Sequence, residues 1–174
     1  MICRRWKLYT AFLGMLLSVG CYSFKGISIP PDVSTFYIDQ FQNNVSNAPP
    51  DIAQRFSDEF RQNVTQTTRL IYNEEIPQVE FSGSISSFNV QSVAPERNSN
   101  AGQVQFGSTL NRLTISVQVS YVNNLDEEDD WSQSFSFFED FENDQNLDDV
   151  QDELIDNIFE QILQDIFTRA FTNW

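Results

Sequence analysis

A strict alternation of apolar and polar residues between positions 113 and 121 constrains the fold more than any other feature of the chain. The apolar positions are Leu113, Ile115, Val117, Val119 and Tyr121, and the polar ones between them are Thr114, Ser116, Gln118 and Ser120. Successive side chains of a β-strand point to opposite faces of the sheet, so a period of two predicts a strand with one face in a core and one in water. Such a strand needs a covering layer on its apolar side only.

Two neighbouring segments predict further strands of the same sheet. Residues 79–90 also alternate, but the phase of their apolar positions flips at Ser86-Ser87, which predicts a β-bulge or a bend there. Residues 131–137 place three aromatic side chains on one face after an acidic turn. Three consecutive strands predict an antiparallel meander, and the aromatic, β-branched segment 35–41 predicts a fourth strand.

Two amphipathic helices are predicted to cover the apolar face. The first runs from Asp51 to about Thr67, with apolar residues every four positions after two prolines. The last follows Asn146, a residue type suited to capping, with Asp148 and Asp149 in the first turn. The expected order is therefore β-α-β-β-β-α, an α+β fold built as a two-layer sandwich with about four strands in a mixed or antiparallel sheet.

The apolar residues of the last helix form adjacent pairs four positions apart, beginning with Leu154-Ile155. Four residues turn the helix about 400°, so each pair drifts about 40° from the one before it, and the stripe moves about 160° over four steps. One sheet face does not cover such a stripe. Either the first helix or a partner protein covers the late residues, and the candidate partner contacts are Ile166, Phe167, Phe171 and Trp174.

The N-terminal residues predict a lipoprotein signal. A basic start is followed by an apolar run of about a dozen residues, which is too short for a membrane span of roughly 20 residues. Gly20-Cys21 then resembles a lipobox, although Ser18 stands where leucine is usual. We expect residues 1–20 to be a signal peptide, Cys21 to be acylated, residues 21–34 to be a linker and residues 35–174 to form the domain. Several acyl chains at Cys21 would anchor the protein stably.

The composition excludes several classes of function. The chain has no histidine, and Cys21 is the only cysteine after the expected signal, which removes His-based triads, thiol nucleophiles and the usual zinc sites. Once the signal is removed, seven basic residues stand against 25 acidic ones, which argues against nucleic acid as a partner. The acidic run 126–130 lacks the glycine and spacing of an EF-hand loop. We therefore expect no enzyme, no cofactor and no bound metal. The acidic charge indicates either solubility or a basic cavity in a partner.

The chain resembles one known family along nearly its whole mature length. The segments "TFYIDQFQN", "FSGSI", "NRLTISVQVSYVN" and "SFSFFEDF", in this order between "GCYSFKG" and the terminal "RAF" and "NW", resemble the LptE-like lipopolysaccharide-assembly lipoproteins of Bacteroidetes. The resemblance implies two helices on a mixed four-stranded sheet, in agreement with the order above. It also implies an outer-membrane lipoprotein on the periplasmic face that plugs and helps to assemble the β-barrel LptD, and with it inserts lipopolysaccharide into the outer leaflet.

Basic residues that could meet lipopolysaccharide are few in the domain. Arg112 begins the alternating strand and Arg97 lies in a polar loop, and either could contact a phosphate or be an ordinary surface arginine. Two other functions remain open: a surface binding module for glycans, and a pilotin-like chaperone of a secretion barrel. The glycan-binding alternative is weakened because no acidic residue follows Cys21 before Asp32 and because the loops carry little aromatic residue.

Overall fold

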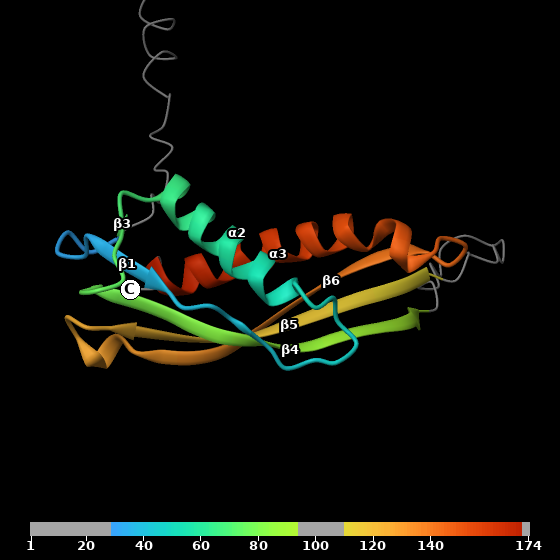
Figure 1. Ribbon diagram of the computed structural model, residues 1–174, viewed down its shortest axis with the longest axis horizontal. Helices are drawn as coiled ribbons and strands as arrows, with labels where there is room; N and C mark the ends of the chain where they lie inside the picture. The colour runs from blue at the N-terminus through green and yellow to red at the C-terminus, as the bar shows by residue number, and fades with distance from the viewer. Residues whose placement is uncertain (1–28, 94–109, 172–174) are drawn as a thin grey trace, which may run out of the picture.

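The computed structural model describes residues 29–93 and 110–171, which form one six-stranded sheet with two helices on one face (Figure 1). In chain order the elements are β1 (Thr35–Ile38), β2 (Gln42–Asn43), α2 (Ile52–Thr67), β3 (Ile71–Tyr72), β4 (Val79–Val93), β5 (Leu110–Asn123), the 3-10 helix η1 (Glu127–Asp129), β6 (Trp131–Glu142) and α3 (Leu147–Phe171). The predicted two-layer α+β fold is confirmed. The sheet has two strands more than expected, β2 and β3, and each is only two residues long, too short to be predicted from the sequence.

The sheet is mixed, with the strand order β3-β1-β4-β5-β6. The predicted meander is confirmed, because β4 pairs with β5 and β5 with β6, both in antiparallel fashion. By contrast, β1 runs parallel to both β3 and β4, and β2 is parallel to β4. The register of β4 against β5 shifts between Ile85 and Ser87, so the bulge predicted from the flip in phase is also present.

The core lies between the sheet and the two helices. The apolar side chains of β5 predicted to face inward are each at most 4 % exposed. Trp131, Phe135 and Phe137 pair with Tyr121, Val117 and Ile115, which places these aromatic residues on the same inward face of β6. The alternation in the sequence therefore identified the buried side of both strands.

Gly83 in β4 allows the ring of Phe41 to lie close to the sheet. A Cβ atom at Gly83 would collide with the carbonyl oxygen of Gln118 and would lie 2.7 Å from Cε1 of Phe41. Phe41 in turn packs edge-on against Phe56 of α2, with 4.9 Å between ring centroids. A glycine is needed here because of this crowding.

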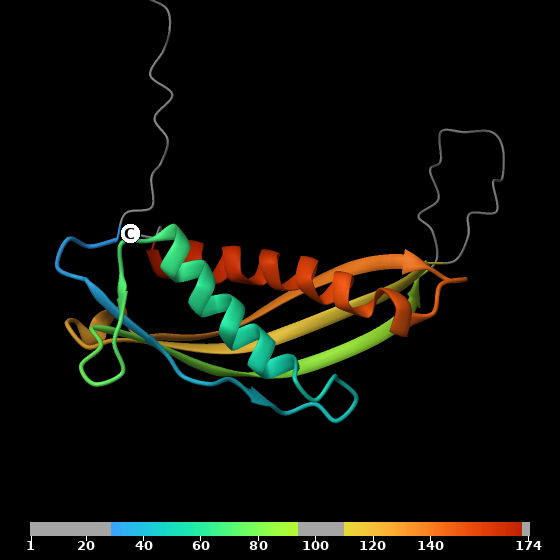
Figure 2. The same cartoon turned by 45° about the horizontal axis from the view of Figure 1, so that its top comes forward.

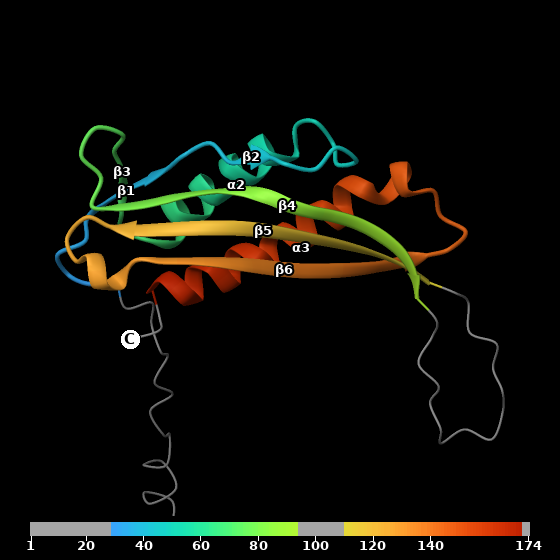
Figure 3. The same cartoon turned by 90° about the horizontal axis from the view of Figure 1, so that it is seen from below.

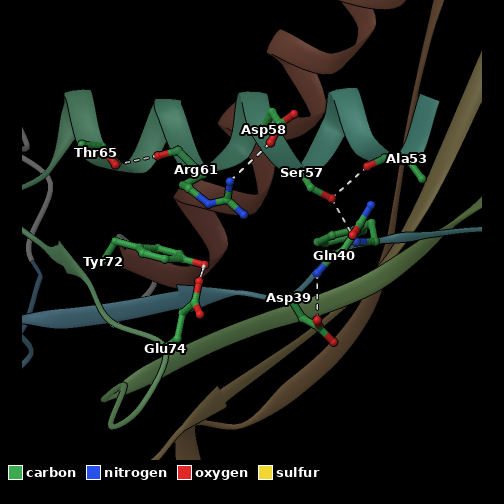
Figure 4. Close-up of polar contacts among 10 residues, drawn as sticks. Asp39, Gln40, Ala53, Ser57, Asp58, Arg61, Thr65, Tyr72 and Glu74 are labelled. Atoms are coloured by element: carbon green, nitrogen blue, oxygen red, sulfur yellow. Dashed lines mark hydrogen bonds and ion pairs between the residues drawn. The ribbon is translucent and has the colours of Figure 1, made fainter. Parts of the chain in front are cut away.

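Polar contacts join α2 to the segment after β1 (Figure 4). The buried Ser57 hydroxyl donates to the carbonyl of Ala53 at 2.8 Å and accepts the backbone N–H of Phe41 at 2.9 Å. The two interactions satisfy a backbone donor that has no partner in a strand, and they place the helix relative to the sheet. Closer to the end of the helix, Arg61 pairs with Asp58 at 3.3 Å and its guanidinium lies 5.0 Å from the ring centroid of Tyr72.

The drifting stripe of α3 is covered by the domain itself as far as Phe171. Ile166 is 0 % and Phe171 is 1 % exposed, and the ring of Phe171 lies 6.1 Å from that of Phe81 in β4. Of the two alternatives for these late residues, burial within the domain therefore holds for Ile166 and Phe171, and no partner is needed to cover them. Neighbouring strands are rotated by roughly 20–25° relative to one another, so the sheet offers the helix a turning surface, on which Phe171 reaches β4.

Candidate functional surface

The long strands β4, β5 and β6 lie side by side with one face turned away from the helices (Figure 3), and the sequence of that face is rich in hydroxyl groups. Residues directly opposed in an antiparallel pair point to the same side of a sheet, so the register identifies the members of this face. We call it the serine face and define it by Ser82, Ser84, Ser87, Asn89, Thr114, Ser116, Gln118, Ser120, Ser132, Ser134 and Ser136. None of these side chains is ionisable, and all are half-buried or exposed. The same side of the sheet also carries Glu80 at one end and Arg112, Asp140 and Glu142 at the other.

Hydrogen bonds between strands order the middle of the serine face. The Ser116 hydroxyl donates to the Ser136 hydroxyl at 3.0 Å, and Nε2 of Gln118 donates to the Ser132 hydroxyl at 3.0 Å. Ser86 at the bulge donates to the carbonyl of Ser116 at 3.1 Å. A hydroxyl has one donor and two acceptor sites, so these contacts leave the surface able to accept further hydrogen bonds.

An ion pair between adjacent strands lies at one end of the serine face. Nε and Nη2 of Arg112 donate to Oδ1 and Oδ2 of Asp140 at 2.7 and 2.9 Å. The guanidinium also lies 3.7 Å from the ring centroid of the exposed Phe138. These hydrogen bonds lower the pKa of Asp140 below its usual value. The positive charge of Arg112 is thus offset by a carboxylate, and the predicted phosphate contact at Arg112 stays a prediction.

The helix layer presents a surface of the opposite character. In α3 seven carboxylates are exposed and Arg169 is the single basic residue; the acidic residues are Asp148, Asp149, Asp152, Glu153, Asp156, Glu160 and Asp165. Arg55 of α2 bridges to Asp152 at 2.8 Å and to Asp156 at 2.6 Å. The other exposed carboxylates of α3 do not contact Arg55, and hydration can stabilise their charge.

A titratable carboxyl group lies between the two helices. Burial, and after it the charge of Asp156, raises the pKa of Glu59 from 4.5 to about 7. The nearby Arg55 opposes this shift but does not cancel it, since its guanidinium is held by Asp152 and Asp156. The ionised form of Glu59 is therefore disfavoured in the folded domain.

Three of the five carboxylates of the acidic turn 126–130 accept hydrogen bonds within the domain. Asp126 accepts the backbone N–H of Glu128, and Asp130 accepts that of Asn123 at 2.7 Å. Asp129 accepts a hydrogen bond from the side chain of the buried Asn123 at 3.1 Å. Among residues 29–93 and 110–171, no group of three or more potential ligands is arranged to hold a metal ion.

The other residues predicted to carry function are only partly placed by the structure. Cys21, Arg97 and Trp174 lie outside the described residues. Phe167 is half-buried and packs edge-on against Phe171, with 4.9 Å between ring centroids. With Ile166 and Phe171 in the core, Phe167 is the one predicted partner contact in the described part of the chain that retains accessible surface. Neither described helix is long and apolar enough to cross a bilayer.

Sequence reasoning found the polar side of β5 but missed its continuation on both neighbouring strands. The signal is serine at every second position, at 82 and 84 in β4 and at 132, 134 and 136 in β6. Taken strand by strand, this pattern indicates only solvent exposure. The register is needed to show that the serines form one continuous surface.

Comparisons with known proteins give a family and a fold. A family model described as "LptE: Lipopolysaccharide-assembly" matches residues 33–170. No curated protein matches the chain at a significant level. Among solved structures, the hypothetical protein CT253 from Chlamydia trachomatis has a TM-score of 0.51 at 9 % identity, with 81 % of this chain and 99 % of that one covered. At this identity the likeness concerns the fold.

Two other solved structures are similar at lower scores. The minor lipoprotein from Acinetobacter baumannii has a TM-score of 0.47 at 8 % identity, and the aligned part covers 79 % of this chain and 95 % of that one. A putative neuraminyllactose-binding hemagglutinin homolog from Helicobacter pylori has a TM-score of 0.48 at 13 % identity, with 87 % and 90 % covered.

Proposed function

Because this chain belongs to the LptE lipopolysaccharide-assembly family, we propose that it is the lipid-anchored partner of an LptD-type outer-membrane β-barrel. In this role it plugs the barrel, helps it to assemble, and takes part in moving lipopolysaccharide to the outer leaflet. The observation that carries the proposal is the family match, which spans residues 33–170 and so includes every helix and long strand of the domain except the last residue of α3.

The surface of the domain supports a place inside a polar cavity. In the described part of the chain only five large apolar residues are exposed, and they lie on several elements: Ile71, Ile76, Val90, Leu125 and Phe138. Surface apolar residues in such small numbers are normal for a protein whose surface is mainly polar. The interior of an outer-membrane barrel is polar, so a plug with polar faces can fill it without a large loss of hydration.

The proposed anchor is Cys21 on the periplasmic face of the outer membrane. The basic and apolar residues before Cys21 and the small residue Gly20 support cleavage and acylation at this cysteine. A chain held by several acyl groups remains at the membrane without any membrane-spanning helix. In the Cys21→Ala variant, we expect loss of labelling by fatty acid and loss of membrane retention. Full labelling of this variant would refute the anchor.

Purification from detergent-solubilised outer membranes tests the function. We expect the tagged protein to bring down one large β-barrel in a one-to-one complex, and depletion of the protein to lower the amount of folded barrel and of surface lipopolysaccharide. Recovery of a secretion barrel instead would assign the pilotin-like role. Recovery of the protein alone, with glycan binding in solution, would assign the binding-module role.

A further inference from the structure

The domain has two broad surfaces, and they differ sharply in the cost of burying them. The outward surface of α3 carries seven exposed carboxylates, whereas the outer side of the long strands carries charged residues only at its ends, and the serine face between them carries none. Taking an ion out of water costs several kcal/mol unless a partner charge replaces the lost hydration. A hydroxyl or amide loses far less, and a hydrogen bond across an interface restores it. Of these two surfaces, the serine face is therefore the one that a neutral polar partner can bury at the lower cost.

The shape of the sheet separates the two surfaces in the same way. The long strands curve up around α2 and α3, so the helices lie on the concave side and the serine face lies on the convex side (Figure 2). The inner wall of a β-barrel is concave, so a convex surface fits against it more closely than a concave one. At roughly 3.3 Å per residue the 14 residues of β5 span about 45 Å, and three strands about 4.8 Å apart span about 14 Å. The whole outer side of the three long strands, of which the serine face is the middle part, thus offers about 600 Å², compared with roughly 800 Å² per partner in a standard interface.

We propose that the serine face docks against the polar inner wall of the barrel partner, while the acidic surface of α3 remains in the water of the lumen and the periplasm. This rests on the proposed function, because the wall is that of the barrel in which the domain sits. Hydroxyl and amide groups of the wall pair with those of Ser82, Ser134 and their neighbours. The ion pair of Arg112 and Asp140 adds little net charge at the end of the face.

Photo-crosslinking tests which surface lies against the wall. In the full-length lipoprotein, a photoreactive residue replaces Asn89 or Ser134 on the serine face, or Glu153 or Glu160 on α3; all four positions are exposed. We expect crosslinks to the barrel from the two strand positions and at least a tenfold weaker yield from α3. Equal yields, or crosslinks from α3 alone, would overturn the docking surface while leaving the barrel partner established.

Charge substitution gives a second measurement with a matched control. Ser134→Asp together with Ser132→Asp places carboxylates on the serine face and should lower the barrel recovered at least tenfold, with an unchanged thermal midpoint. Ser134→Thr keeps the hydroxyl and should bind normally, and Asn157→Asp adds the same charge on exposed α3 without effect. Full recovery with the double variant would refute the proposal. If the unaltered protein brings down no barrel at all, the proposed function fails, and the docking surface fails with it.

Discussion

Replacing Phe171 by alanine distinguishes a core residue from a partner contact. The side chain is 1 % exposed, and its ring lies 4.9 Å from Phe167 and 6.1 Å from Phe81. Phe171 is the last described residue of α3, and its contact with β4 fixes the last described turn of the helix on the sheet. Removal of the ring leaves a cavity between helix and sheet that the backbone at the helix end closes only in part.

The expected loss is large for a domain of this size. Phe→Ala in a core costs about 3–5 kcal/mol, and the position near a helix end, where the chain can relax, favours the lower part of this range. At about 2–4 °C per kcal/mol for a chain of 150–250 residues, the thermal midpoint should fall by about 10 °C. The half-buried Phe167 provides the control, and Phe167→Ala should cost about 1 kcal/mol.

Thermal and urea unfolding followed by circular dichroism measure both variants against the unaltered protein, together with the amount of barrel that each one brings down. We expect Phe171→Ala to lose stability but, below its midpoint, to retain the barrel. A change of less than 1 kcal/mol for Phe171→Ala, combined with loss of the barrel, would refute the assignment of Phe171 to the core and return it to a partner surface.

Three further perturbations test the sheet and the helix interface. Val117→Asp puts a charge at a fully buried position and should unfold the domain, whereas Gln118→Asp on the outer face should leave urea unfolding nearly unchanged; equal effects would mean that the faces are exchanged. Burial raises the pKa of Glu59 to about 7, so the folded domain binds more protons than the unfolded chain between pH 4.5 and 7, and its stability rises as pH falls through this window. Glu59→Gln should therefore stabilise the domain by about 1 kcal/mol at pH 8, after allowance for solvent screening, and by almost nothing at pH 4; a gain of the same size at both pH values would contradict this origin. Gly83→Ala should lower the free energy of unfolding by about 1–3 kcal/mol, because the added methyl group meets the sheet backbone and the ring of Phe41. An unchanged urea midpoint would show that this close approach is absent.

Strong periodicity made the meander and both helices predictable. The alternation around Val117 defines the buried face of β5 by itself, and the flip of phase at Ser86 locates the bulge. In both places a local pattern reports directly on whether a side chain faces the core or water. These elements are also the long ones, in which many residues contribute to the same signal.

Short and parallel pairings could not be predicted in the same way. β2 and β3 have two residues each, which is a single period of alternation, and one period is too short to be recognised as a pattern. The parallel pairing of Phe36 with Val79 is set by tertiary packing and leaves no turn signal between the two strands. The drift of the α3 stripe does not by itself show what buries Ile166 and Phe171, because the shape of the surface beneath the helix is a property of the assembled strands.

The candidate surface was predictable only in part for a similar reason. Arg112 was identified as a basic residue at the start of a strand, but Asp140 lies 28 positions further along the chain, and only the register of β5 and β6 brings them together. The serine face likewise depends on three strands being aligned. A single strand sequence shows which side chains face water, but it does not show which of them are neighbours.

The position of β1 has a consequence for the order of folding. Phe36 finds its partners in β3 and β4 about forty residues further along the chain, whereas β4, β5 and β6 pair with segments that follow one another. Pairings between distant segments carry the larger loop-closure entropy and form late. We expect the meander to form first and β1 to enter between β3 and β4 near the end of folding. If Cys21 is the lipid anchor, as proposed, the strand nearest to the anchor is then the last to gain its partners, and the protein is tethered to the membrane while β1 is still unpaired.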